Sequence, residues 1–151
     1  MSCVTDRAAM TAALQWLTRK HGEFDLVGLT DSTPEPAECR RLQRESRSPV
    51  EVPEVTLAQL SRRNEEVLEF DTSIFSINGV RNLAAGDTRV WSRPSVLVSL
   101  PAYDGDVAIL SMTYRTASEI PETATYLVVM RRSLGDWSVV WSTVQEGVIV
   151  S

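Results

Sequence analysis

The sequence predicts a single α+β domain, with N-terminal helices packed on an antiparallel sheet made mainly by a C-terminal four-strand meander. Three observations support this fold class. The length of 151 residues suits one domain. Helical spacing of apolar residues appears in the first half of the chain. Residues 93–151 contain four strand-length runs of alternating apolar and polar residues, separated by turn residues.

Three helices are expected before residue 67. The first covers 5–20, with Thr5 as its cap, Gly22 as its left-handed exit, and one apolar face that includes Ala9, Ala13, Trp16 and Leu17. The second covers 34–46 and starts at Thr33-Pro34, because proline at the first helical position loses no needed hydrogen bond. Its few apolar residues place it on the rim. The third covers 56–66, opens at Thr56 and buries Leu57 and Leu60.

Strands are expected between and after these helices. A short strand over 23–29 follows the first helix, and a longer one over 68–77 precedes a turn at Asn78-Gly79 and a loop over 80–90. The meander consists of strands over 95–100, 107–115, 125–131 and 137–144. Because Pro101 cannot donate a ladder hydrogen bond, a long loop over 101–106 is favoured over a tight hairpin. Trp137, Val139 and Trp141 are expected to share the core face.

Composition excludes several functional classes. A hydrophobic fraction of 43% and a charged fraction of 23% are typical of a soluble protein, and no apolar run approaches the length of a membrane span. The net charge of −5 disfavours nucleic acid binding, which needs a positive face. The first residues, MSCVTDRAAM, carry no signal-peptide pattern and therefore predict a cytoplasmic protein as written. If a leader had been removed, a periplasmic setting or a lipid anchor on Cys3 would apply instead.

Reactive residues are scarce. His21 is the single histidine, and its place at a helix end favours a structural role. With one histidine and two distant cysteines, Cys3 and Cys39, no metal site is expected, and a disulfide between the two cysteines stays open. The loop carboxylates are expected to be solvated, namely Asp104, Asp106, Glu119 and Glu122. No sequence motif implies a cofactor.

Two groups of residues are candidates for a binding site. Arg40, Arg44 and Arg47 lie near one face of the second helix, where they would meet a phosphate or an acidic partner, although a solvated helix face is the simpler interpretation. The aromatic residues of the sheet would line a pocket if the sheet is curved; these are Tyr114, Tyr126, Trp137 and Trp141. Such an arrangement of helices and bent sheet is similar to the NTF2-like cone, by analogy at the level of fold alone. Asp71 would then be the buried base of an enzyme.

Several short patterns resemble a diffuse group of uncharacterised bacterial α+β domains that are often exported. They are Leu60 with Asn64, Ser99-Leu100-Pro101 followed by Val107-Ala108, and Tyr126-Leu127-Val128-Val129-Met130-Arg131 leading to Gly135 and Trp137. The resemblance covers about the last 90 residues of the 151 and implies a bacterial origin and an extracytoplasmic setting, but no activity.

The sequence favours a non-catalytic binding or protein-interaction domain, because residues suited to catalysis are so few. The alternative is a small-molecule enzyme or carrier with a hydrophobic pocket and a single buried carboxylate. A third expectation is an assembly role, in which an edge strand or apolar face forms a homodimer. The ligand or protein partner stays unidentified at this level.

Overall fold

The computed structural model describes residues 3–30, 33–65, 74–82 and 93–148. In this part of the chain three helices and seven strands form an α+β fold, and the helices precede most of the strands, as predicted. The helices are α1 (Cys3–His21), α2 (Pro36–Glu45) and α3 (Glu54–Arg63). The strands are β1 (Phe24–Leu29), β2 (Val80–Asn82), β3 (Ser95–Val98), β4 (Ala102–Asp104), β5 (Val107–Arg115), β6 (Glu122–Ser133) and β7 (Asp136–Val148).

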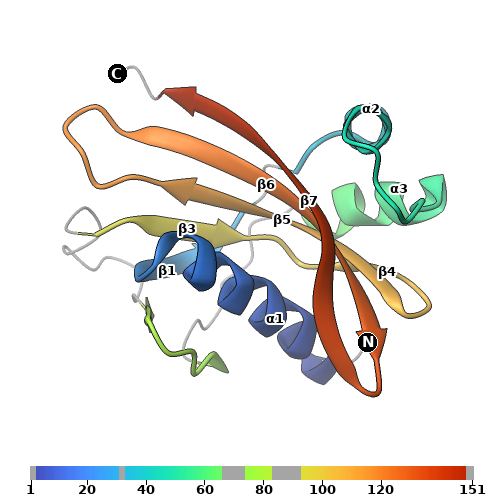
Figure 1. Cartoon of the computed structure of the whole chain (residues 1–151), viewed down its shortest axis with the longest axis horizontal. Coiled ribbons are helices and arrows are strands. Elements are labelled where there is room, and N and C mark those ends of the chain that lie inside the picture. The colour runs from blue at the N-terminus through green and yellow to red at the C-terminus, as the bar shows by residue number, and fades with distance from the viewer. Residues whose placement is uncertain (1–2, 31–32, 66–73, 83–92, 149–151) are drawn as a thin grey trace.

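The strands form one mixed sheet in the order β2-β1-β3-β5-β6-β7, and β4 pairs with β5 beyond the end of β3. Strand β1 runs parallel to both β2 and β3, whereas the remaining pairs are antiparallel. In Figure 1, α1 lies across the sheet, while α2 and α3 lie together at a distance from α1. The long antiparallel strands β5, β6 and β7 are the predicted meander, whose first member is β3.

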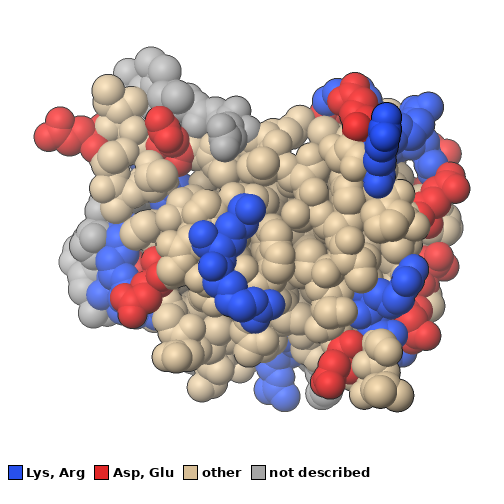
Figure 2. All heavy atoms as spheres, viewed as in Figure 1, with Lys and Arg blue, Asp and Glu red and all other residues tan. Residues whose placement is uncertain are grey.

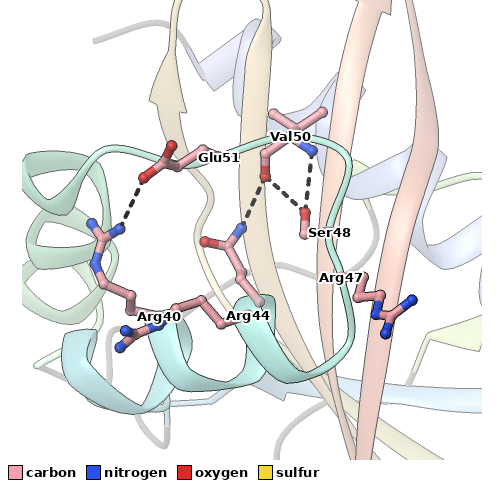
Figure 3. A pocket seen from close by; sticks show the side chains of 7 residues that line it. Arg40, Arg44, Arg47, Ser48, Val50 and Glu51 are labelled. Atoms are coloured by element: carbon pink, nitrogen blue, oxygen red, sulfur yellow. Dashed lines mark hydrogen bonds and ion pairs between the residues drawn. The ribbon is translucent and has the colours of Figure 1, made fainter.

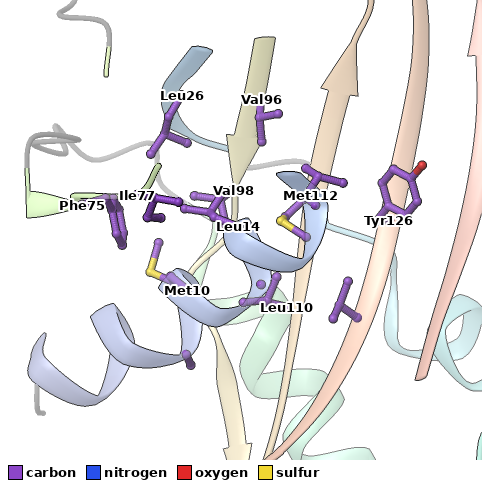
Figure 4. Packing of buried hydrophobic residues seen from close by; sticks show 14 of the residues in the cluster. Met10, Leu14, Leu26, Phe75, Ile77, Val96, Val98, Leu110, Met112 and Tyr126 are labelled. Atoms are coloured by element: carbon purple, nitrogen blue, oxygen red, sulfur yellow. The ribbon is translucent and has the colours of Figure 1, made fainter. Parts of the chain in front are cut away.

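The central strands are covered on both faces. Side chains from α1, β1, β3, β5 and β6 form one buried cluster, part of which is drawn in Figure 4. Alternate residues of the same strands, such as Ile109, Leu127 and Val129, join a second cluster with α2 and α3. The expectation that the meander has a single core face is therefore wrong for β5 and β6. The unbroken apolar run from Tyr126 to Met130 is typical of a strand buried on both faces.

A β-bulge in β7 corrects the expected alignment of the tryptophans. Val129 pairs with Trp141 and Met130 pairs with Val139, so Val140 is an extra residue between two paired positions. The extra residue reverses the alternation of side chains along the strand. Trp137 and Val139 consequently pack against the α1 cluster, whereas Trp141 is buried in the cluster of α2 and α3.

Helix starts differ from the expected ones. Thr5 is inside α1, which begins at Cys3. Helix α2 begins at Pro36 rather than Pro34, with Glu35 as the N-cap, and α3 begins after Pro53 rather than at Thr56. A proline does stand in the first turn of α2, as expected. Pro34 and Pro36 are both compatible with the first helical position, and the helix begins at the second of them. At the other end of α1, Gly22 has a φ of 84° and its N–H bonds to the Thr18 carbonyl, as predicted.

The connections between strands also differ in part from expectation. Asp104 pairs with Val107, so the predicted long loop is a tight two-residue hairpin with Gly105 at a φ of 57°. Pro101 does not interrupt a ladder, because it lies between β3 and β4 where pairing with β5 has already broken. The predicted turn at Asn78-Gly79 is confirmed. Of the strand expected over 68–77, the described residues 74–77 are not a strand, and the rest lies outside the described residues.

Candidate functional site

The predicted aromatic site is divided between the two faces of the sheet. Tyr114 and Tyr126 are buried on the face covered by α1, and Trp137 packs at the edge of the same cluster. Trp141 lies on the opposite face, where its indole Nε1–H donates to the Ser46 carbonyl at 3.4 Å. The four residues therefore do not line a common cavity. Asp71 lies outside the described residues.

The two tyrosines instead form a cluster with the end of α1. The His21 ring stacks on Tyr114 with a centroid distance of 4.1 Å and an interplanar angle of 16°. His21 Nε2 lies 2.6 Å from the Tyr126 hydroxyl, and Trp16 makes an edge contact with Tyr126 at 5.7 Å between centroids. Sequence analysis placed His21 at the helix end but missed these partners, because 105 residues separate His21 from Tyr126.

This cluster has the geometry of packing rather than catalysis. Burial, and to a lesser degree the charge of Lys20, lowers the pKa of His21 below its ordinary value. A base would need a nucleophile or water held against its free nitrogen, but the nearest polar partner is the hydroxyl of a tyrosine. Burial raises the pKa of Tyr114, so that phenol stays protonated. The predicted structural role of His21 agrees with these contacts.

Both buried carboxylates of the described residues are held by arginine. Asp25 is fully buried and accepts two hydrogen bonds of 2.8 Å from Arg81. Asp6 accepts from two nitrogens of Arg63 at 3.2 and 2.8 Å and from the Tyr103 hydroxyl at 2.7 Å. Each carboxylate is therefore engaged by a guanidinium group through two hydrogen bonds. These pairs connect elements of the fold and are not a catalytic dyad.

A more informative feature is a surface pocket at the end of α2 with a volume of about 450 Å³. We call it the arginine pocket. Figure 3 shows its lining residues, which come from α2 and from the chain that follows it: Arg40, Gln43, Arg44, Arg47, Ser48, Val50 and Glu51. It contains all three arginines that the sequence placed on one helix face, and it adds a loop that sequence analysis had not connected with them.

Local hydrogen bonds build the wall of the arginine pocket. The N–H of Arg47 bonds to the Arg44 carbonyl and the N–H of Ser48 to the Gln43 carbonyl, which is the Schellman arrangement at a helix end. Gln43 is buried and donates from Nε2 to the Val50 carbonyl at 3.4 Å. The Ser48 hydroxyl donates to the same carbonyl at 2.7 Å. These bonds hold the loop against α2 without using a guanidinium group.

Charges on α2 are partly neutralised. Arg41 bonds to Glu38 and Glu45, and this pairing lowers the pKa of Glu38. In the arginine pocket, Arg40 lies 3.4 Å from a carboxylate oxygen of Glu51, whose side chain is 86% exposed. Within the described residues, Arg44 and Arg47 have no acidic partner. Figure 2 shows acidic and basic side chains interspersed near the margins of this face, and basic side chains near its centre.

A second pocket of about 500 Å³ runs beside α1. Its walls include Thr11 and Gln15 of α1 together with Trp137, so it contains one of the four predicted aromatic residues. Arg132 lies over the Trp137 ring at 5.4 Å from the centroid. The charged residues Arg7 and Asp136 and the hydroxyl side chain of Ser76 also line this pocket. One arginine lines this second pocket, whereas three line the arginine pocket.

Other predictions about site chemistry can be compared with the described residues. Among them, no group of three potential metal ligands is present. Cys39 is a free buried thiol, and burial raises its pKa to about 12. The four carboxylates expected in loops are exposed, as predicted for solvated groups, although Asp104 is the last residue of β4 and Glu122 the first of β6; the other two are Asp106 and Glu119.

None of the helices in the described part of the chain has the length and apolar character to cross a membrane. Comparison with known proteins found no matching family model, no matching curated protein and no matching solved structure.

Proposed function

We propose that this chain is a non-catalytic binding domain that takes an anionic group at the arginine pocket. The observation that carries the proposal is a pocket with three guanidinium groups, two of which lack an acidic partner in the described part of the chain. Guanidinium groups form strong charge-assisted hydrogen bonds with carboxylates and phosphates. A binding role is supported over a catalytic one because the hydroxyl and the carboxylate in the pocket are both engaged: Ser48 donates to the Val50 carbonyl and Glu51 pairs with Arg40.

An enzyme or carrier with an NTF2-like hydrophobic pocket is the alternative. Its ligand would lie between α1 and the sheet, and in the described residues that space is occupied by buried side chains such as Met10, Leu14 and Met112. Interiors packed in this way leave no room for a ligand without rearrangement. The bacterial origin and exported setting expected from the sequence stay predictions.

Binding can be tested by isothermal titration calorimetry and NMR with two probes, inorganic phosphate and a short polyglutamate peptide. We expect saturable binding of at least one probe, with shifts of the arginine side-chain resonances. The variant Arg40→Ala/Arg44→Ala should weaken binding about tenfold or more, because it removes two charge-assisted contacts. Arg19→Ala is the matched control, since Arg19 is an exposed arginine on α1 and should have no effect.

Failure of both probes to bind at about 10 mM, which corresponds to a binding free energy near −3 kcal/mol, would contradict the proposal. Chemical conversion of a bound ligand would contradict its non-catalytic part. Light scattering on the same samples would measure whether the chain is a monomer or a homodimer, which the sequence left open.

A further inference from the structure

We infer that the arginine pocket takes an extended acidic peptide segment of a partner protein, and that Glu51 occupies part of the pocket until such a segment displaces it. This inference rests on the proposed function and specifies its ligand. Three observations support it: the directions of the three arginines, the Arg40–Glu51 contact and the backbone conformation at Arg47.

The arginines do not converge on one point. In Figure 3, Arg40 and Arg44 extend toward one side of the pocket, whereas Arg47 extends toward the other. A compact anion such as phosphate would not reach all three groups at once. A chain with carboxylates spaced along it can contact both sides. Charge complementarity therefore favours an extended segment rich in Asp and Glu over a single small anion.

Glu51 shows that a carboxylate fits beside Arg40. Its oxygen lies 3.4 Å from Arg40 Nη1, and its side chain is 86% exposed, so little holds it there besides this ion pair. Exposed ion pairs of this kind contribute up to about 1 kcal/mol. An incoming carboxylate must compete with Glu51 for Arg40, and removing the Glu51 charge should therefore strengthen binding.

Arg47 has a conformation that does not favour arginine. Its φ is 52°, and it occupies the position after the helix end where glycine is the usual residue. A side chain with Cβ costs about 1 kcal/mol or more in this left-handed region. Arg47 is nevertheless exposed and has no acidic partner among the described residues. Strained residues cluster at binding sites, and the inference gives the Arg47 side chain contact with the ligand as its use.

The net charge of −5 opposes attraction of an acidic partner from a distance. At physiological salt, however, charges separated by more than about 8 Å are largely screened. The arginines in the pocket then dominate the local field. Binding should be modest in affinity and should weaken as salt increases.

The decisive experiment compares hexaglutamate peptide with inorganic phosphate on three forms of the full chain, by calorimetry at fixed salt. For the unmodified chain, the peptide should bind at least about tenfold more tightly than phosphate, since it reaches both sides of the pocket. Glu51→Gln should strengthen peptide binding about two- to fivefold, the range expected for loss of one exposed ion pair.

The Arg47→Gly variant tests whether weaker peptide binding can occur without a loss of protein stability. It should weaken peptide binding about two- to fivefold and leave phosphate binding unchanged, because phosphate uses Arg40 and Arg44. At the same time it should raise the melting temperature by about 2–4 °C, since glycine relieves the strained backbone. A loss of binding that accompanies a gain in stability cannot be attributed to unfolding.

The outcomes distinguish the extended acidic ligand from the anion site itself. If phosphate and peptide bind equally and Arg47→Gly affects neither, the extended ligand is wrong but the anion site stands. If Glu51→Gln fails to strengthen peptide binding, the displacement role of Glu51 is wrong. If a short oligonucleotide binds more tightly than the peptide, the acidic partner is the wrong class. If nothing binds, the proposed function itself fails.

Discussion

His21 illustrates how a single residue acquires its properties from tertiary contacts. The sequence places it at the end of a helix, and a cation there would be favoured by the helix dipole. The tertiary structure instead stacks its ring on Tyr114 and places Nε2 beside the Tyr126 hydroxyl. Burial and the nearby Lys20 charge then favour the neutral ring and lower its pKa.

This lowered pKa predicts a stability that depends on pH. In the unfolded chain His21 has its ordinary pKa of 6.5, so below this pH the unfolded state binds more protons than the folded state. The contribution of His21 is complete above pH 6.5 and is lost as the pH falls through the lower value of the folded protein. Urea unfolding between pH 7.5 and 5 should show falling stability on acidification.

The matched variant for this test is His21→Gln, which keeps a polar group near Tyr126 but does not titrate. Its unfolding free energy should vary less with pH over the same interval. An identical pH dependence in both proteins would show that other groups cause the effect.

At the scale of the element, the connection between β6 and β7 carries a second strained residue. Ser133 pairs with Asp136, and the two turn residues Leu134 and Gly135 have φ values of 53° and 84°. Positive φ at both central positions is typical of a type I′ turn, in which asparagine followed by glycine is preferred. Leu134 is fully exposed and gains nothing from burial in this position.

Leu134→Asn should therefore stabilise the protein by about 1 kcal/mol, because asparagine tolerates the left-handed region. This corresponds to an increase of roughly 2–4 °C in melting temperature for a chain of this size. Calorimetric melting would measure it. Leu134→Ala is the control: it removes the same exposed apolar surface but keeps the strain, and should change stability little. Equal effects of both substitutions would contradict the explanation.

At the scale of the whole molecule, a polar clamp joins the layers on the two faces of the sheet. Arg63 at the end of α3 bonds to Asp6 of α1 and to the Pro101 carbonyl, and the Tyr103 hydroxyl of β4 donates to Asp6. The Arg63 and Asp6 side chains are 14% and 10% exposed. Helix α1 covers one face of the sheet and α3 the other, so this clamp fixes their relative position.

Asp6→Ala should destabilise the protein by about 3 kcal/mol, because it removes the carboxylate that pairs with the largely buried Arg63 guanidinium. The double variant Asp6→Leu/Arg63→Met should lose less than the single one, since it removes both charges of the pair. Asp106→Ala is the control, because its pair with Arg132 is largely exposed and should contribute less than about 1 kcal/mol. Denaturant unfolding would measure all three. A similar small loss for Asp6→Ala and Asp106→Ala would refute the role of the clamp.

Local signals in the sequence predicted many elements of this fold correctly. The range 107–115 matches β5, Gly22 ends α1 and Asn78-Gly79 forms a turn as expected, because glycine conformation and apolar alternation act over a few residues. The same signals predicted a shared face for Trp137 and Trp141. The bulge at Val140 that separates them is a property of pairing with β6, which the β7 sequence does not contain.

For the candidate site, too, part could be predicted from the sequence and part depended on the tertiary structure. The sequence by itself determined the fold class, the long antiparallel strands and the presence of Arg40 and Arg44 on the second helix. Arg47 was predicted on the same helix face but lies beyond the end of α2. Only the tertiary structure decided that Glu51 and Ser48 close a pocket beside those arginines, and that His21 meets two tyrosines of the sheet. The physical reasons differ. The pocket lies within residues 40–51, but it depends on a left-handed turn at Arg47, a position where glycine is the usual signal and arginine gives none. The His21 contacts form only when segments 105 residues apart in the chain pack together, beyond the reach of propensity and periodicity.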